Sequence, residues 1–351
     1  MRSVAFIGVM VLLLCSCADP NPSKTISPPI SVIFDTDIGN DVDDVLALDM
    51  LYKYLDQGSI NLLGIVSSKD DHPWCAEFLD ILNTWYGYPD IPIGVLYNGV
   101  SKEDSIYTEH TKYTKYVCDL ELDGKPMFER KFDDYDKTPC SVDLMRKLLA
   151  GAPDTSVVII TVGFSTNISR LLNSEPDEYA SLNGKELIIK KVKYLSMMAG
   201  NYERSEGLKE FNVYMDEESA RNVFSNWPTQ ILVSGFKVGL SILFPASSIE
   251  NDFNYVDHHP MVEAYRCYLP MPYDRPTWDL TAVLAVIEKD SAFFGYSPVG
   301  RVSVTPDEFI FQEDKEGNVT FLTVTEEEAQ RIKKRFVTLI SGIPESKSDA
   351  D

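Results

Sequence analysis

The chain has 351 residues, of which 32 are Lys or Arg and 54 are Asp or Glu, so its net charge is −22 at neutral pH. An acidic surface of this kind repels phosphate backbones, which argues against binding to nucleic acid. Hydrophobic residues make up 44% of the chain, which is ordinary for a packed globular protein and too high for a disordered one.

The first segment has the composition of an export signal. Met1-Arg2 precedes an apolar run from Val4 to Leu14, and the run ends in Leu-Cys-Ser-Cys at residues 14–17. This ending resembles a bacterial lipobox, which implies cleavage before Cys17 and attachment of lipid to its sulfur. A plain signal peptide or a short anchor helix are the alternatives, but the run is too short to span a bilayer comfortably. We therefore predict a lipoprotein signal peptide over residues 1–16. We also predict an exported protein, lipid-anchored to a bacterial membrane in the periplasm or cell envelope, with no other membrane contact.

A polar linker and scattered cysteines follow. Residues 17–30 are rich in Pro, Ser and Asn, a composition typical of an extended tether that holds a domain away from a membrane. The other cysteines of the mature chain are irregularly spaced and form no Cys-x-x-Cys pair, so structural zinc is not expected. Export would permit a disulfide, but we favour isolated core thiols at Cys75, Cys118, Cys140 and Cys267.

Strand and helix patterns alternate from residue 31 onward. Short apolar runs predict strands, and apolar residues at helical spacing predict helices between them. The expected strands are residues 31–34, 61–67 and 91–95, and the expected helices are residues 45–55 and 77–86. This alternation favours a parallel sheet that is covered by helices on both faces.

Residues 98–140 are polar, aromatic and charged, and we expect long loops there. The alternation resumes with strands at 157–160, 192–198 and 230–238 and with a helix from about Asn167. Glu316-Gly317-Asn318 is typical of a hairpin turn, and Thr325 with Glu328 forms a capping box for a last helix to about Ile340. We therefore predict one large α/β domain over residues 31–342, with an open, mostly parallel, Rossmann-like sheet and a polar C-terminal tail at 343–351. A dinucleotide fingerprint is missing after the first strand, which disfavours a nicotinamide enzyme.

The most informative run lies directly after the first predicted strand. It contains five carboxylates within ten residues, namely Asp35, Asp37, Asp41, Asp43 and Asp44. Alternation in an extended chain puts Asp35 and Asp37 on the same side, at the carboxyl end of a strand where α/β proteins bind ligands. Carboxylates this close raise one another's pKa unless a cation offsets them, and hard oxygen donors favour calcium or magnesium over zinc. Helix N-capping would explain Asp41 or Asp43, but it would not explain Asp35 and Asp37.

This run resembles the N-terminal signature of the inosine–uridine nucleoside hydrolases, Asp-x-Asp-Pro-Gly-x-Asp-Asp. Ile38 stands in the proline position, and two residues are inserted between Gly39 and the final Asp pair. The helix that follows aligns Asp43 and Asp44 with that pair, and Asp41 remains a competitor for either role.

Four further segments resemble the same family in the same order. Residues 161–167 resemble its Gly-containing turn that ends in Thr-Asn, and residues 197–202 resemble a Met-Gly-Gly-Gly-Tyr strand end. Residues 210–216 match its Glu-Phe-Asn run and the Asp that follows, and residues 275–279 precede an apolar helix with an Asp at the last calcium position. Each segment is weak evidence alone, but five in family order make coincidence improbable.

The resemblance implies a nucleoside hydrolase fold and calcium-dependent hydrolysis of the N-glycosidic bond of ribonucleosides, which gives ribose and free base. The implied Ca²⁺ ligands are Asp37, Asp44, the carbonyl of Val162, and Asp279, with Asp37 also the base that activates a water held by the metal. The implied substrate contacts are Asp43, Asp71, Met198, Glu210, Phe211, Asn212 and Trp278. The resemblance also implies a homodimer or homotetramer.

Two departures from the family bear on the substrate. Asp71 falls where the family usually has an Asn, and Trp278 falls where many members have a His. A purine-preferring subgroup of the family has a Trp at the position of Trp278 and stacks it on the base. Trp278 therefore favours purine nucleosides as substrates. Of the histidines, His258 and His259 are expected to be solvated.

Two alternatives remain open from the sequence. The departures at Ile38, Asp71 and Trp278, and the lack of a clear counterpart to the family's ribose-contacting Asn upstream of Glu210, also fit a non-catalytic ribose- or nucleoside-binding lipoprotein on the same scaffold. A magnesium phosphatase of the haloacid-dehalogenase type is the second alternative, because Asp35-Thr36-Asp37 suits its strand-Asp-x-Asp start. That family expects Thr or Val where this chain has Gly39, which disfavours it.

Overall fold

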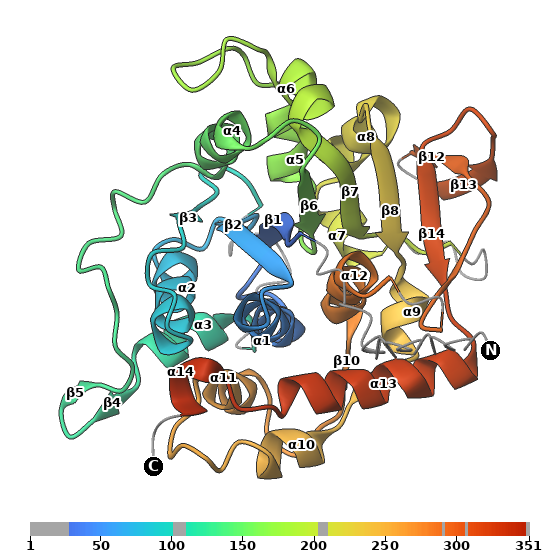
Figure 1. Cartoon of the computed structure of the whole chain (residues 1–351). Helices are drawn as coiled ribbons and strands as arrows, with labels where there is room; N and C mark the ends of the chain where they lie inside the picture. The colour runs from blue at the N-terminus through green and yellow to red at the C-terminus, as the bar shows by residue number, and fades with distance from the viewer. Residues whose placement is uncertain (1–27, 101–109, 203–209, 290–291, 306–307, 349–351) are drawn as a thin grey trace, which may run out of the picture.

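Strands from the whole length of the chain form one large sheet (Figure 1). The structure is a computed structural model, and it describes residues 28–100, 110–202, 210–289, 292–305 and 308–348. The predicted signal peptide, the lipidation site Cys17 and nearly all of the tether lie outside the described residues.

The sheet is mostly parallel, as the sequence predicted. Its order is β13 (Phe309–Glu313), β12 (Gly300–Val304), β14 (Val319–Thr323), β8 (Gln230–Ser234), β7 (Val192–Met198), β6 (Val157–Thr161), β1 (Ile30–Thr36), β2 (Ile60–Ser67) and β3 (Ile93–Gly94). From β14 to β3 all neighbouring strands are parallel, whereas β12 and β13 are antiparallel, and β11 (Gly295–Tyr296) pairs with β14.

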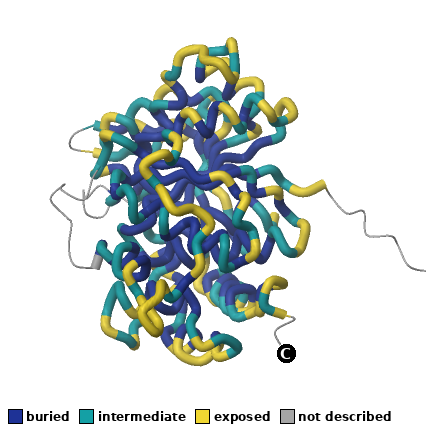
Figure 2. The backbone as a smooth tube through the Cα atoms, turned by 90° about the vertical axis from the view of Figure 1, so that its left-hand side faces the viewer, coloured by how far each residue is buried: buried dark blue, intermediate teal, exposed yellow. Residues whose placement is uncertain are grey.

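Both faces of the sheet are covered by helices. Along β1, Val32 and Phe34 pack into one apolar cluster and Ile33 into another, since successive side chains point to opposite faces. The first cluster includes residues of α1 (Asp43–Asp56), α2 (Trp74–Trp85), α3 (Tyr113–Cys118), α11 (Pro260–Tyr268), α12 (Trp278–Ile287) and α13 (Glu326–Ile340). The second includes residues of α4 (Ser141–Gly151), α5 (Thr166–Leu172), α6 (Gly184–Lys191), α7 (Phe211–Met215) and α8 (Glu217–Asn226). The α/β class with an open, mostly parallel sheet is therefore confirmed, and the buried interior follows the central strands (Figure 2).

Shorter elements connect this framework. They are α9 (Phe236–Leu240), α10 (Ala246–Asn251), α14 (Glu345–Ser348), a 3₁₀ turn (His110–Lys112), and the strand pairs β4–β5 (Glu121–Leu122, Lys125–Pro126) and β9–β10 (Leu243–Phe244, Arg275–Pro276). The predicted C-terminal tail includes α14, which packs on the ends of α1 and α2, because Glu345 N–H donates to Asp56 and Ser346 Oγ donates to the carbonyl of Trp85.

Some local predictions were wrong. The predicted hairpin turn at 316–318 connects β13 to β14, but β12 lies between these strands, so they do not pair. The strand predicted to continue to Val238 ends at Ser234, because Gly235 begins α9. His259 is 2% exposed rather than solvated, since its Nδ1 accepts the Met261 N–H at the start of α11 and its ring lies 4.1 Å from that of Trp85.

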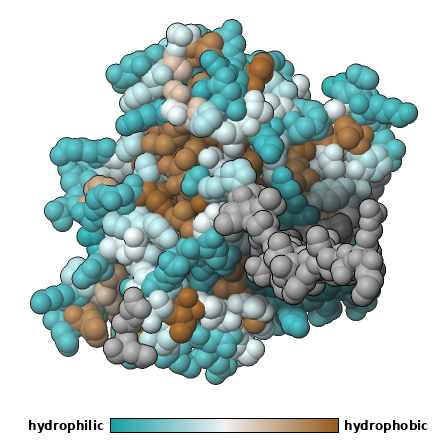
Figure 3. Space-filling view, viewed as in Figure 1, coloured by the Kyte–Doolittle hydropathy of each residue, from teal (hydrophilic) through white to brown (hydrophobic). Residues whose placement is uncertain are grey.

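The surface and the thiols agree with the composition. The face shown in Figure 3 is largely hydrophilic, as expected for a chain of charge −22. Cys75, Cys118, Cys140 and Cys267 are all free thiols, as we expected. Within the described ranges, no helix has the length and apolarity needed to cross a membrane.

Candidate active site

A tight turn after β1 carries the acidic run into the site. The N–H of Asn40 donates to the carbonyl of Asp37 at 3.0 Å, and Gly39 adopts a φ of +97°, which side-chain-bearing residues rarely reach. The Tyr113 hydroxyl accepts the Gly39 N–H at 2.9 Å and donates to the carbonyl of Asp41 at 2.8 Å. The turn is thus held by a buried phenol from α3, and it delivers Asp43 and Asp44 to the first turn of α1.

Asp35 and Asp37 do not share a role. One oxygen of Asp35 accepts from Asn167 Nδ2 and the other from Thr161 Oγ1, both at 2.8 Å. Burial raises the pKa of Asp35 to about 7, and these two hydrogen bonds oppose the rise. Asp35 therefore joins β1 to β6 and α5, whereas Asp37 lines the pocket described below.

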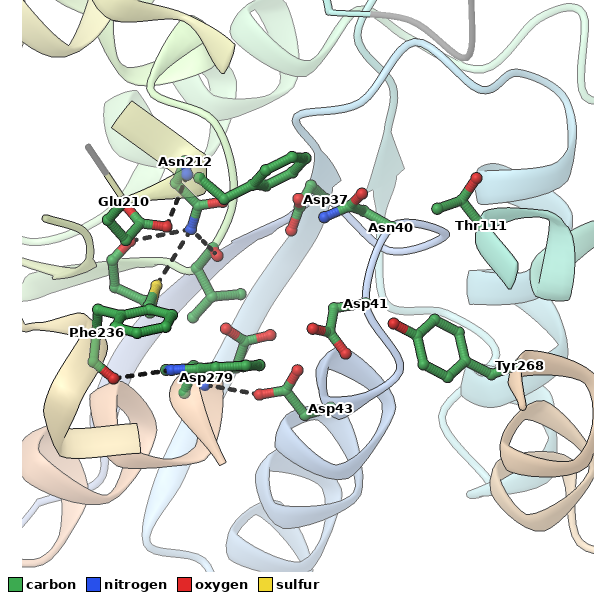
Figure 4. Close-up of a pocket in the computed structure, with 14 residues that line it drawn as sticks. Asp37, Asn40, Asp41, Asp43, Thr111, Glu210, Asn212, Phe236, Tyr268 and Asp279 are labelled. Atoms are coloured by element: carbon green, nitrogen blue, oxygen red, sulfur yellow. Dashed lines mark hydrogen bonds between the residues drawn. The ribbon is translucent and has the colours of Figure 1, made fainter. Parts of the chain in front are cut away.

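Four buried carboxylates from two distant segments come together at the carboxyl ends of the strands. They are Asp37, Asp43 and Asp44 from the turn after β1, and Asp279 from the first turn of α12. The Asp279 N–H donates to Asp43 Oδ2 at 3.1 Å, which ties the two segments directly, and Thr36 donates to Asp44 Oδ1. Figure 4 shows Asp37, Asp43 and Asp279 directed toward the same space.

Burial and mutual repulsion both oppose ionisation of these acids. Burial is the main cause that raises the pKa of Asp37 to about 7 and the pKa values of Asp43, Asp44 and Asp279 well above the usual range. The charges of the neighbouring carboxylates raise all four further. Asp41 has a cationic partner, because Arg275 Nε donates to its Oδ1 at 2.8 Å and the same guanidinium also contacts its Oδ2.

The ends of β6 and β7 form the next wall. Asn212 Nδ2 donates to the carbonyls of Val162, at 2.8 Å, and Met198, at 3.1 Å, so one amide joins the two strand ends. Glu210 caps α7 by accepting the N–H groups of Asn212 and Val213, and it also accepts the Gly200 N–H at 2.9 Å. Burial raises the pKa of Glu210 to about 7.

An aromatic wall faces the acids. The Trp278 indole donates from Nε1 to the carbonyl of Phe236 at 2.8 Å, and its ring stacks on that of Phe236 with centroids 5.5 Å apart. The Arg275 guanidinium lies 5.3 Å from the Trp278 ring and 5.1 Å from the Tyr268 ring. Gly239 makes this packing possible, because a Cβ there would lie 2.4 Å from Cα of Trp278.

These walls enclose a cavity of about 270 Å³, near the lower end of the range for small-molecule sites. Most of the predicted site residues line it, namely Asp37, Asp43, Val162, Met198, Glu210, Phe211, Asn212, Trp278 and Asp279. Asp44 is buried but is not among the lining residues, and its Oδ1 accepts a hydrogen bond from Thr36 Oγ1. Asp71 is not among the lining residues: its Oδ2 lies 3.8 Å from Lys69 Nζ and next to Gly39, so its predicted contact with substrate stays a prediction.

The sequence alone missed several lining residues, namely Asn40, Thr111, Phe236 and Tyr268. Asn40, and also Arg275 beside the pocket, lie inside segments that the family resemblance covers. The resemblance could therefore place both residues near the site, but it did not indicate their role. Phe236 and Tyr268 carry no local signal, because an aromatic residue at a helix end is most often core.

The donor set fits a hard cation. In the part of the chain that the structure describes, no three His, Cys, Asp or Glu side chains are arranged so that they could hold a metal ion as they stand. Three buried oxygens nevertheless have no hydrogen-bond partner, namely Asp37 Oδ2, Asp43 Oδ1 and Asp44 Oδ2. Buried carboxylates that lack partners and repel one another are the groups that a hard divalent ion would satisfy.

An open parallel sheet with acids and a cavity at the carboxyl ends of its strands is the arrangement in which α/β proteins commonly bind small molecules. The family is shown by a match over most of the chain. The family model described as "Inosine-uridine preferring nucleoside hydrolase" matches residues 32–334, and the chain belongs to that family. This match leaves the phosphatase alternative without support.

Individual relatives are distant. The chain is 33% identical over 117 residues to the "Pyrimidine-specific ribonucleoside hydrolase RihA" of Salmonella newport, a match that covers 33% of this chain and 34% of the relative. It is 28% identical over 204 residues to the protein of the same name from Citrobacter koseri, and there 56% of this chain and 57% of the relative are covered. The matches thus span about a third and a little over half of these relatives.

A solved structure confirms the fold over nearly the whole chain. The structure described as "Purine-Preferring Ribonucleoside Hydrolase from Gardnerella vaginalis" superposes with a TM-score of 0.67 and 17% identity. The superposition covers 89% of this chain and 98% of that one. At this identity the likeness concerns the fold, and the predicted nucleoside hydrolase fold is therefore confirmed.

Proposed function

We propose that the protein is a calcium-dependent ribonucleoside hydrolase that breaks the N-glycosidic bond and releases ribose and free base. The observation that carries this proposal is the convergence of buried carboxylates from positions 37–44 and 279 on one cavity. Such a cluster is unfavourable in a folded protein unless a cation or a ligand compensates it. Family membership supplies the reaction class.

Asp37, Asp44, Asp279 and the carbonyl of Val162 would hold the ion. A bound Ca²⁺ would supply the positive charge that orients vicinal sugar hydroxyls and a water molecule. The Val162 carbonyl already accepts one hydrogen bond from Asn212, and a carbonyl oxygen has a second lone pair for a cation.

Different side chains of the site take different roles in the hydrolysis. Water adds to the anomeric carbon, the bond from that carbon to the base nitrogen breaks, and the base leaves with a proton taken from solvent, while the proton that Asp37 receives returns to solvent. Asp37, which has an unpartnered oxygen and lines the cavity, takes the proton from the attacking water. Asp43, Glu210 and Asn212 offer polar groups to the sugar, with Met198 and Phe211 beside them.

The aromatic wall favours purine nucleosides. Trp278 offers a large stacking surface that Phe236 and Arg275 hold in place, and a two-ring base gains more from stacking than a one-ring base. The relatives differ on this point, since the RihA proteins are described as pyrimidine-specific and the Gardnerella vaginalis enzyme as purine-preferring.

The alternative is a protein of the same fold that binds ribosides without cleaving them. The observation that favours it is Asn212, whose amide donates to two backbone carbonyls and to the sulfur of Met198 instead of facing the cavity freely. A riboside that binds in a calcium-dependent way without release of free base would support this alternative.

The test is a turnover screen of purine and pyrimidine ribosides with calcium and with a chelator. We expect base release that depends on calcium and is faster for purines. Asp37→Asn should bind riboside but lose on the order of 10²–10⁴ in rate. Asp35→Asn is the matched control, because Asp35 is equally buried two residues away but bonds Thr161 and Asn167. Unchanged turnover in Asp37→Asn would remove Asp37 from the mechanism.

We also propose that the protein is exported and lipid-anchored through Cys17, and that it forms a homodimer or homotetramer. The support for the anchor is the lipobox-like ending of the N-terminal apolar run. A Cys17→Ser variant should leave the membrane fraction, and a wild-type protein without lipid on its mature N-terminus would refute the anchor. Sedimentation would test the oligomer.

A further inference from the structure

A buried lysine lies among the acids of the site. Lys69 follows β2, is 4% exposed, and donates from Nζ to the carbonyl of Gly39 at 2.5 Å. Its Nζ also lies 3.8 Å from Asp71 Oδ2. A lysine is seldom this buried without a compensating role, because removal of its charge from water is costly.

The position of Lys69 is set by the turn that carries the candidate metal ligands. Gly39, whose carbonyl accepts the ammonium, is the residue with φ of +97° between Asp37 and the start of α1. A Cβ at Gly39 would lie 3.2 Å from Asp71 Oδ2, so the turn, Lys69 and Asp71 pack directly against one another. The positive charge is therefore fixed against the backbone of the turn that carries the acids of the site.

The charges around the site are not balanced without Lys69. Arg275 is paired with Asp41 and also attracts Asp43, whereas Asp37, Asp44 and Asp279 repel one another and Asp43. Among the charges that act on Asp37, that of Lys69 has the largest effect, and it lowers the pKa of this carboxyl against the effect of burial. Burial lowers the pKa of Lys69, and the charges of Asp71, Asp37 and Asp44 oppose this shift and favour the protonated form.

We propose that Lys69 is a built-in counter-cation, which offsets part of the charge of the acid cluster in the metal-free protein and so lowers the affinity of the cluster for calcium. This inference rests on the proposed calcium site. A fixed ammonium beside the ligands stabilises the folded protein without metal, and it repels a divalent ion that binds nearby. The Asn-to-Asp departure at position 71 then has a physical reason, because Asp71 serves the lysine rather than the substrate.

The chain contains a matched control at another place. Lys53 is also 4% exposed, also donates to a backbone carbonyl, that of Ile340, and also pairs with an aspartate, Asp49, at 2.8 Å. The partners of Lys53 lie on α1 and at the end of α13, whereas Lys69 contacts the turn that carries Asp37. Lys53→Met thus removes a buried ammonium from an equivalent setting away from the acids of the site.

The experiment measures calcium binding by calorimetry and thermal unfolding with and without calcium for wild type, Lys69→Met and Lys53→Met. Both variants should lose roughly 5–10 °C in Tm in chelator, since each breaks a buried ion pair. Lys69→Met should bind calcium at least about threefold more tightly than wild type and recover more Tm on calcium addition, whereas Lys53→Met should keep the wild-type Kd. Lys69→Arg, which keeps the charge, should stay within about twofold of wild type.

The outcomes separate this inference from the proposed function. If wild type binds no calcium, the proposed metal site fails. If wild type binds calcium and Lys69→Met binds it equally or more weakly, Lys69 is a structural contact and the counter-cation inference is overturned. If Lys69→Met does not fold, Lys69→Gln is measured by the same criteria: tighter calcium binding supports the inference, and equal or weaker binding overturns it.

Discussion

A single methyl group at Gly163 should disturb the site through the backbone of its central acid. Gly163 directly follows Val162 at the end of β6, and a Cβ there would lie 2.6 Å from both N and Cβ of Asp37 and 2.4 Å from Ser68 Oγ. The contact to the Asp37 backbone is about 0.8 Å short of the 3.4 Å at which ordinary contact begins. The Ser68 hydroxyl can rotate away, but the Asp37 backbone cannot, so it has to shift together with the turn that follows the central strand β1.

We therefore expect Gly163→Ala to push the Asp37 turn outward by a large part of an ångström. Overpacking of this kind costs about 1–3 kcal/mol of folding free energy, which corresponds to a Tm loss of roughly 2–8 °C in a chain of this size. A displacement near 1 Å at the reacting group costs on the order of 10²-fold in rate. The assay is steady-state riboside hydrolysis together with thermal unfolding in calcium.

The control is Gly151→Ala at the last residue of α4, where an added Cβ would meet no atom within 4 Å. It should keep wild-type turnover and gain up to about 1 kcal/mol, because alanine loses less backbone entropy than glycine. Gly163→Ala turnover within threefold of wild type would refute the claim that this close approach positions Asp37.

Three further outcomes are expected. Trp278→Ala should lower kcat/KM for purine ribosides about tenfold because the stacking surface is lost, whereas Trp278→Phe keeps an aromatic ring and should retain most of the activity. Equal losses for purine and pyrimidine ribosides would contradict the stacking role. Arg275→Met should lower the free energy of unfolding by about 1–3 kcal/mol and should lower turnover, because it leaves Asp41 unpaired beside the other acids. An unchanged Tm would show that the ion pair does not stabilise the fold. Burial, with the charges of Lys53 and Lys347, lowers the pKa of His259, so below pH 6.5 the unfolded chain binds a proton that the folded chain does not. The free energy of unfolding therefore decreases as the pH is lowered below 6.5, by up to about 1.4 kcal/mol per pH unit. His259→Asn, which keeps a capping acceptor, should show a shallower loss between pH 6.5 and 5 by urea unfolding, and an equal slope would exclude His259.

The local pattern of the sequence was sufficient for the framework. β7 was predicted at its observed bounds, and α13 was located from the capping box at Thr325 and Glu328, which forms as expected. These predictions succeed because a buried strand and an amphipathic helix each impose a short repeat on the residues that form them. The antiparallel edge could not be predicted in this way, since which strands pair across β12 depends on contacts between residues far apart in sequence.

The acidic run likewise predicted a ligand site, and the family resemblance predicted most of the residues that line the cavity. The sequence could not show which acids are already satisfied. Asp35 bonds Asn167 and Thr161, more than 120 residues away, and Asp41 pairs with Arg275 from the other half of the chain. Only the folded chain decides which carboxylates remain for a ligand, because the groups that bond the other acids lie on β6, α5 and β10, and only tertiary packing brings these distant segments beside the turn after β1.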